Sequence, residues 1–132
     1  MGRQVSYLLD THAFVWAVMQ PSELSPGVRT LLENPDTEIS ISAASAWEIA
    51  TKFRLGKLPS AAPIVADIGG VVARLGARWL AIDQAHAMRA GGYPQSHRDP
   101  FDRILAAQAE VEALILISKD PALLQFGAKI YW

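Results

Sequence analysis

The sequence contains no cysteine. This absence excludes disulfide bonds, thiolate zinc sites and cysteine nucleophiles, and it agrees with a reducing compartment such as the cytoplasm. The chain also lacks a long hydrophobic run: the apolar stretch near its start is too short for a signal peptide, and no later stretch has the length needed to cross a membrane. We therefore expect a cytoplasmic protein that does not enter the membrane.

An excess of charge of one sign is also missing, because 12 basic and 13 acidic side chains give a net charge of −1. A nucleic-acid partner would then have to be held by local cations or by a metal ion. There is no glycine-rich phosphate loop, and His12, His86 and His97 do not have the spacing of zinc ligands. The 132 residues, 51% of them hydrophobic, are typical of one globular domain spanning 1–132.

Short apolar runs alternate with helical patterns along this domain. The runs predict five strands, at 5–9, 38–42, 78–82, 113–118 and 128–132. The segments between them predict helices over 11–19, 25–35, 43–59, 62–76 and 83–91, then from the turn at residues 99–100 to about 113, with a last turn at 121–127. Ser25 is expected as the N-cap of the second of these helices, and Gly56, in the C′ position, is expected to end the third. This alternation predicts an α/β domain with a mainly parallel sheet of about five strands.

Acidic residues follow the predicted strands at the points where helices begin. Asp10 comes directly after the first strand and Asp120 just after the most apolar one. Glu48 lies in the early turns of the helix after the second strand, and Asp99 and Asp102 open the helix that leads into the fourth. Right-handed crossovers place such junctions along one edge of the sheet, where open α/β sheets bind ligands. We therefore expect these carboxylates to converge.

Converging carboxylates require a cation. Two like charges about 4 Å apart repel by about 4 kcal/mol at an effective dielectric constant of about 20. A divalent ion removes this repulsion, and oxygen ligands favour hard cations such as Mg²⁺ or Mn²⁺. Such an ion lowers the pKa of a bound water, which suits the hydrolysis of a phosphodiester.

Each acid except Asp10 also has a purely structural explanation. Asp99 suits the N-cap of a helix, Asp102 in the first turn suits the dipole of that helix, and Asp120 suits a cap between a strand and a helix. Glu48 and Lys52 have the i,i+4 spacing of a solvated ion pair. Asp10 is harder to explain in this way, because a carboxylate that ends a buried strand loses hydration unless something binds it.

Four blocks of sequence carry a family resemblance: YLLDTHAFVW, SAASAWEIATKFRLGKL, HRDPFDRILAAQA and LISKDPAL. In order and spacing they resemble the signature blocks of PIN-domain ribonucleases, in particular the VapC-type toxins of bacterial toxin–antitoxin pairs, from Tyr7 to about Trp132. The resemblance implies a PIN-like three-layer α/β/α sandwich and an endoribonuclease that depends on Mg²⁺ or Mn²⁺. It also implies an RNA substrate, a cognate antitoxin protein that blocks the enzyme, and a homodimer.

Carried over by position, the acidic set of the family falls on Asp10, Glu48, Asp102 and Asp120, with Asp99 as an additional acid. The resemblance implies that Asp10 and Asp102 bind the metal directly, and that Glu48 and Asp120 bind it directly or through water. It leaves open whether Asp99 or Asp102 contacts the ion, and we favour Asp102.

Polar neighbours of these acids are expected to support them. By the same resemblance, Thr11, Ser45 and Ser118 orient carboxylates or waters, while Arg103 pairs with an acid or reaches a substrate phosphate. Thr11 is also a candidate helix cap. Ala46 and Ser118 are mild departures from the family pattern, where a larger apolar residue and threonine are commoner.

Several further expectations concern packing and charge. A stripe of small residues at Ala106, Ala109 and Ala113 is expected to let its helix approach the sheet closely. The four tryptophans are expected in the core or at an interface rather than as base-stacking platforms. Basic side chains near the acids are candidates for an RNA path, although solvated surface charge is the commoner role; they are Lys52, Arg54, Lys57, His97, Arg98 and Lys119.

Two alternatives to a nuclease remain open from the sequence. A receiver-like signalling domain also gathers acids and magnesium at the edge of a parallel sheet, but neither 38–42 nor 78–82 offers a convincing phosphoacceptor aspartate at its end. A non-catalytic binding module with a PIN fold is the other alternative, and the intact acidic set argues against it.

Overall fold

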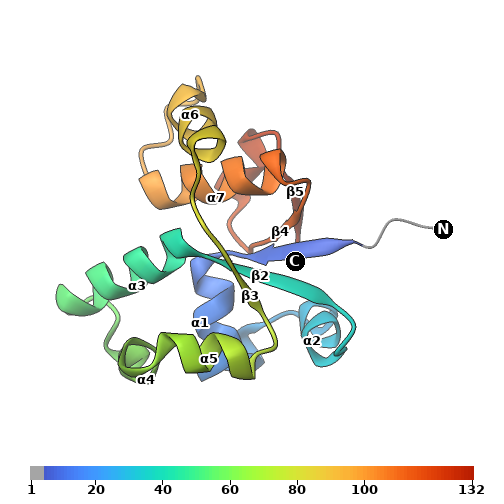
Figure 1. Ribbon diagram of the computed structural model, residues 1–132, viewed down its shortest axis with the longest axis vertical. Coiled ribbons are helices and arrows are strands. Elements are labelled where there is room, and N and C mark those ends of the chain that lie inside the picture. Colours follow the sequence, from blue (N-terminus) through green and yellow to red (C-terminus); the bar gives the residue numbers. More distant parts are fainter. Residues whose placement is uncertain (1–4) are drawn as a thin grey trace.

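A computed structural model of the protein describes residues 5–132 and contains one five-stranded sheet (Figure 1). Every strand pair in it is parallel, and the spatial order is β3-β2-β1-β4-β5. The strands are β1 (Ser6–Leu9), β2 (Glu38–Ser42), β3 (Arg78–Leu80), β4 (Ile115–Ile117) and β5 (Lys129–Tyr131). The predicted number, order along the chain and direction of the strands are confirmed.

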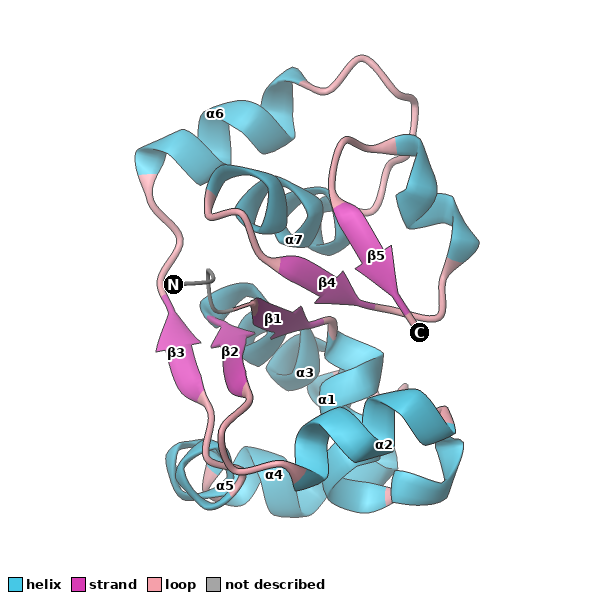
Figure 2. Ribbon diagram, turned by 90° about the vertical axis from the view of Figure 1, so that its right-hand side faces the viewer, coloured by secondary structure: helices cyan, strands magenta, loops and turns pink. Residues whose placement is uncertain are grey.

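Helices cover both faces of the sheet (Figure 2). One face carries α1 (Thr11–Met19), α2 (Pro26–Glu33), α3 (Ala43–Arg54), α4 (Ala62–Ala66) and α5 (Ile68–Arg74), and the other carries α6 (Gln84–Gly92) and α7 (Pro100–Val111). Three 3₁₀ turns complete the connections, at Pro21–Glu23, Pro59–Ala61 and Pro121–Gln125. Within the described residues no helix is both long enough and apolar enough to span a membrane. The three-layer α/β/α sandwich is confirmed.

Each face of the sheet has its own apolar core, because neighbouring residues of a strand point to opposite faces. Leu9 and Ile117 pack with α1 to α5, whereas Leu8 and Leu116 pack with α7 and the last 3₁₀ turn. The central strands β1 and β4 are thus apolar on both faces, which explains their uninterrupted hydrophobic sequences.

The strand order reverses between β1 and β4. From β1 the chain moves outward through β2 and β3 on one side, and it returns through β4 and β5 on the other. At such a point the connections that leave the two central strands run to opposite sides of the sheet. A crevice therefore forms between these connections, at the carboxyl ends of the two strands. Asp10 follows β1, and the segment 118–120 follows β4, so both segments lie at this crevice.

The structure corrects two details of the predicted helices. The single helix predicted over 62–76 is two helices, and Asp67 lies between them and caps α5 by accepting from the N–H of Gly70 (3.1 Å). The small-residue stripe of α7 includes the buried Ala106 and Ala109 but not Ala113, which is exposed beyond the helix end with φ 55°. Gly56 has φ 72° after α3 and ends that helix as predicted.

Candidate active site

Asp10 lies at the carboxyl end of β1 and is buried. Its Oδ1 accepts from the N–H of Ala13 (2.8 Å), so Asp10 and not Thr11 caps α1. Burial raises the pKa of Asp10, and hydrogen bonds from the Ser118 hydroxyl and the Ala13 N–H oppose this shift. The negative charge of Asp102 raises the same pKa further, which places these two acids in one electrostatic environment.

Glu48 is held from inside the protein by the hydroxyl of Thr11, which in turn contacts the hydroxyl of Ser45. Thr11 donates from Oγ1 to Oε1 of Glu48, and the Thr11 and Ser45 hydroxyls are 3.0 Å apart. All three residues are buried, with Glu48 only 3% exposed. Thr11 and Ser45 therefore connect α1 and α3 at the base of the candidate site.

A salt bridge with Lys52 neutralises the second oxygen of Glu48. Lys52 Nζ lies 2.5 Å from Glu48 Oε2. Burial disfavours the charged lysine, but the hydrogen bond with Glu48 and the nearby charges of Glu48, Asp99 and Asp102 outweigh it and raise the pKa of Lys52. The expectation of a solvated pair is wrong, because a carboxylate buried this deeply needs a bound counter-charge.

The two aspartates at the start of α7 have different surroundings. Asp99 is the N-cap, and its Oδ1 accepts from the N–H groups of Phe101 (2.9 Å) and Asp102 (3.2 Å). Asp102 Oδ2 lies 2.9 Å from His97 Nε2. Burial raises the pKa of Asp102, the charges of Asp99 and Glu48 add to this rise, and His97 opposes it. Asp102 therefore belongs to the same electrostatic cluster as Glu48 and Asp10.

Asp120 is an exposed cap on the last 3₁₀ turn, where it accepts from the N–H of Ala122 (2.9 Å). Ser118 links Asp120 to Asp10, because its hydroxyl accepts from the N–H of Asp120 (3.1 Å) and hydrogen-bonds the Asp10 carboxylate. A cavity of about 250 Å³ lies over this link, and its lining residues are Asp10, His12, Trp16, Lys119 and Asp120.

Among the five acids, the hydrogen bond between two of them is the one from the Asp102 N–H to Asp99 Oδ1. In the described part of the chain, the group whose ligand atoms all lie within 4.8 Å of one another is Asp83, His86 and Glu112, and it includes none of the five. Basic residues contact two of the predicted acids instead, with Lys52 on Glu48 and His97 on Asp102. The i,i+4 spacing indicated the first of these contacts, whereas nothing in the sequence indicated the second.

The contacts of Asp83, His86 and Glu112 form a helix cap and a link between two helices. His86 Nδ1 accepts from the N–H of Asp83 (3.0 Å), and Asp83 Oδ1 accepts from the N–H of His86 (3.0 Å), which together form a capping box at the start of α6. His86 Nε2 lies 2.8 Å from Glu112 and so ties α6 to the end of α7. Both ring nitrogens are therefore engaged within the fold.

Arg103 has a structural role that the sequence did not indicate. Its guanidinium donates to the carbonyl oxygens of Ala90 (2.9 Å), Gln95 (2.8 Å), His97 (3.0 Å) and Tyr93 (2.7 Å). Four of its five N–H donors bind backbone, and among residues 5–132 it forms no ion pair with an acid. The expected contact with a substrate phosphate stays a prediction. Arg103 fixes the loop that carries His97 to the helix that carries Asp102.

The tryptophans divide into two groups. Trp16 and Trp132 pack against the core beside α1, as predicted. Trp47 is 61% exposed and makes an edge contact with Phe101, with the ring centroids 4.9 Å apart, and Trp79 is also exposed. The core assignment is wrong for Trp47 and Trp79, while the alternative, an interface, stays a prediction.

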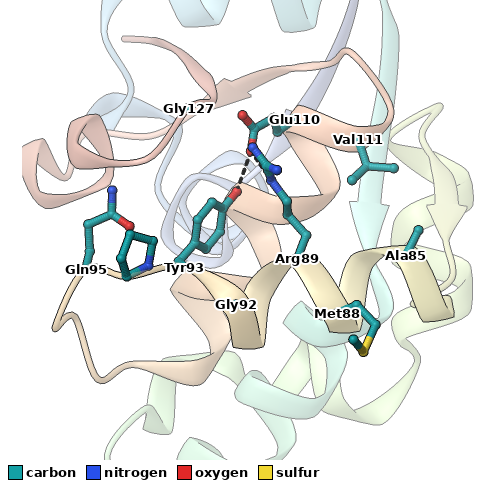
Figure 3. Close-up of a pocket in the computed structure, with 10 residues that line it drawn as sticks. Ala85, Met88, Arg89, Gly92, Tyr93, Gln95, Glu110, Val111 and Gly127 are labelled. Atoms are coloured by element: carbon teal, nitrogen blue, oxygen red, sulfur yellow. Dashed lines mark hydrogen bonds and ion pairs between the residues drawn. The ribbon is translucent and has the colours of Figure 1, made fainter.

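A second cavity, of about 530 Å³, lies between α6, α7 and Gly127 (Figure 3). Within it Glu110 accepts from Arg89 Nε (2.7 Å) and from the Tyr93 hydroxyl (2.9 Å). Burial and the Glu110 charge raise the pKa of Tyr93 to about 12. Arg89, Tyr93 and Glu110 are thus bound to one another, whereas Oε1 of Gln95, another lining residue, is buried without a hydrogen-bond partner. None of the five predicted acids lines this cavity.

Comparison with known proteins gives consistent matches. The family model described as PIN domain matches residues 7–129. Ribonuclease VapC16 from Mycobacterium tuberculosis is 39% identical over 74 residues, which are 54% of this chain and 52% of that protein. The match thus spans about half the length of this curated relative.

Two solved structures share the fold over nearly the whole chain. The crystal structure of VapBC2 from Rickettsia felis, bound to a DNA fragment from its promoter, has a TM-score of 0.70 at 14% identity and covers 96% of this chain and 98% of its own. A toxin–antitoxin complex from Klebsiella pneumoniae has a TM-score of 0.63 at 17% identity, with coverage of 96% and 97%. At these identities the likeness shows the fold.

Proposed function

Because the chain belongs to the PIN-domain family, we propose that it is an endoribonuclease that depends on Mg²⁺ or Mn²⁺ and acts as the toxin of a toxin–antitoxin pair. Its relative in M. tuberculosis is named as a ribonuclease, and two proteins of the same fold are solved as toxin–antitoxin assemblies. By analogy we expect an RNA substrate and a cognate antitoxin. A homodimer and a cytoplasmic location stay predictions.

The observation that carries the proposal is a buried carboxylate at the switch point of the sheet. Asp10 is inside the protein, and burial raises its pKa more than its hydrogen bonds and the neighbouring His12 lower it. No side chain forms an ion pair with it among residues 5–132. A bound cation would stabilise the charged form of such a buried carboxylate. Its neighbours present carboxylate oxygens as well, which are the ligands that hard divalent ions prefer.

The residues that would hold the ion are Asp10, Asp102, Glu48 and Asp120, and we favour Asp102 over Asp99 because backbone amides already occupy Asp99. When bound, a divalent ion lowers the pKa of a water enough for that water to attack a phosphodiester near neutral pH. The expected products carry 5′-phosphate and 3′-hydroxyl ends.

The chain's own side chains orient these acids. Ser118 and the Ala13 N–H fix Asp10, while Thr11 fixes Glu48 and is itself hydrogen-bonded to Ser45. Supporting hydrogen bonds of this kind hold ligands in position and are part of how a metal site is tuned.

The two alternatives from the sequence have less support. Doubly wound receiver domains have the strand order 2-1-3-4-5, whereas this sheet has 3-2-1-4-5. A non-catalytic PIN module has no need for four acids at one edge, since their mutual repulsion destabilises a protein that binds no cation.

Cleavage of single-stranded RNA by the purified chain tests the proposal. We expect cutting with Mg²⁺ or Mn²⁺ and loss of cutting when a chelator removes the ion, and full recovery when the ion is added back. The Asp10→Asn variant, purified in parallel, controls for contaminating ribonucleases. Cleavage that continues in chelator would contradict the metal-dependent mechanism.

A further inference from the structure

The cavity beside Asp10 is lined by a lysine as well as by acidic side chains. Its lining residues are Asp10, Asp120, Lys119, His12 and Trp16. The acids belong to the proposed metal site, but the metal does not explain the lysine. A cation that lines a metal pocket weakens the binding of another cation there, so Lys119 calls for a different ligand.

Lys119 differs from Lys52, which binds Glu48, because no acid within residues 5–132 pairs with it. Within residues 5–132 Lys119 forms no ion pair with a carboxylate, although two aspartates line the same cavity. Its ammonium charge is therefore available to an anionic ligand.

The indole of Trp16 holds Lys119 in this position. Lys119 Nζ lies over the Trp16 ring, 5.9 Å from its centroid, which is within the range of a cation–π contact. Trp16 is itself fixed by Trp132 on its edge and by His12, with centroid distances of 5.9 Å and 5.6 Å. Ser118 and Lys119 are consecutive: Ser118 is buried and bonds Asp10, while Lys119 is exposed at the cavity.

From this geometry we propose that Lys119 binds a phosphate group of the RNA strand in the cavity next to Asp10 and Asp120, with Trp16 as the positioning residue. The inference rests on the proposed function, because that function brings a phosphodiester to these two acids. An ammonium group binds phosphate oxygens as a point charge, which suits a contact with the strand at any base.

Direct binding of RNA, measured without cleavage, tests the proposal. We suggest the full chain with Asp10→Asn, in chelator, titrated against a short labelled single-stranded RNA by fluorescence anisotropy over a series of salt concentrations. Lys119→Gln is expected to raise Kd by about fivefold. It should also lower the slope of log Kd against log salt by about 0.7, the amount expected for one phosphate contact on a single strand.

Matched variants distinguish the loss of the Lys119–phosphate contact from the effect of removing any one positive charge. Lys129→Gln removes an exposed lysine on β5 outside this cavity and should leave both quantities unchanged. Lys119→Arg should restore the slope, and Trp16→Leu should weaken binding where Trp16→Phe does not. Since Lys119 is exposed, its substitution is not expected to unfold the chain.

The outcomes distinguish this inference from the proposed function. If the unsubstituted chain cuts RNA but Lys119→Gln binds it like Lys129→Gln, the assignment of Lys119 is overturned and the nuclease proposal stands. If Lys119→Gln weakens only the binding of an acidic protein partner, Lys119 is an antitoxin contact and the inference is again wrong. If the chain neither cuts nor binds RNA, both proposals fail.

Discussion

Replacement of Asp10 by Asn is expected to reduce RNA cleavage by about a thousandfold or more, since loss of metal-based activation removes several kcal/mol of transition-state stabilisation. The fold should survive. Asn is as good an N-cap as Asp, and its Oδ1 can still accept from the N–H of Ala13. The substitution also removes a charge whose burial is unfavourable, so the metal-free variant should be at least as stable as the parent chain.

The matched control is Asp67→Asn. Asp67 is also an aspartate that caps a helix, but its side chain is exposed and its N-cap bond is to Gly70 in α5. Cleavage rates at saturating Mg²⁺, together with circular dichroism of both variants, give the comparison. Undiminished activity in Asp10→Asn would remove Asp10 from the mechanism, and equal losses in both variants would point to capping.

Replacement of Arg103 by Met is expected to lower the free energy of unfolding by about 3 kcal/mol, because it leaves four backbone carbonyls without their charged donor. The loop that includes His97 should loosen. The Arg103→Lys variant should recover part of the loss, since an ammonium cannot reach four carbonyls with the geometry of a guanidinium.

Denaturant unfolding measures this effect, with Arg78→Met as control. Arg78 forms an exposed pair with Glu38 and should contribute less than about 1 kcal/mol. Similar small losses in both variants would show that the four bonds add little stability. A weaker salt dependence of RNA binding in Arg103→Met, with stability unchanged, would instead support the phosphate role that the sequence suggested.

The strands and helices were predictable because the sequence patterns that indicate them lie within short segments of the chain. Period-two and continuous apolar runs identified the strands, and Ser25, Gly56 and Pro100 marked helix ends. Parallel topology then placed Asp10 and the segment after β4 at one edge, since carboxyl ends of parallel strands meet there. The candidate acids could therefore be chosen before their positions in space were known.

The partners of those acids were not predictable in the same way. Arg103 donates to carbonyl oxygens, which every residue has, so its sequence position beside Asp102 suggested an acid or a phosphate. The i,i+4 spacing of Glu48 and Lys52 is the same for an exposed pair and a buried one. Only the packing of α3 on α1, through Thr11, shows that Glu48 lies inside the protein.

The most direct test of the central claim is the unfolding free energy of the full chain, measured in chelator and in Mn²⁺ from pH 3.8, the ordinary pKa of an aspartate, up to neutral pH. The pKa values of Asp10 and Asp102 are raised above this ordinary value in the folded state. Between pH 3.8 and the raised pKa values the folded chain therefore holds more protons than the unfolded chain, and the contribution of these groups to stability falls as pH rises through the raised pKa values.

We predict that in chelator the unsubstituted chain loses stability with rising pH relative to the Asp10→Asn variant. Mn²⁺ at a hundred times its Kd should stabilise the unsubstituted chain by about 2.7 kcal/mol at neutral pH. The same ion should have little effect on Asp10→Asn. Equal stabilisation of both chains by Mn²⁺, or none of either, would contradict the claim that these carboxylates form a divalent-metal site.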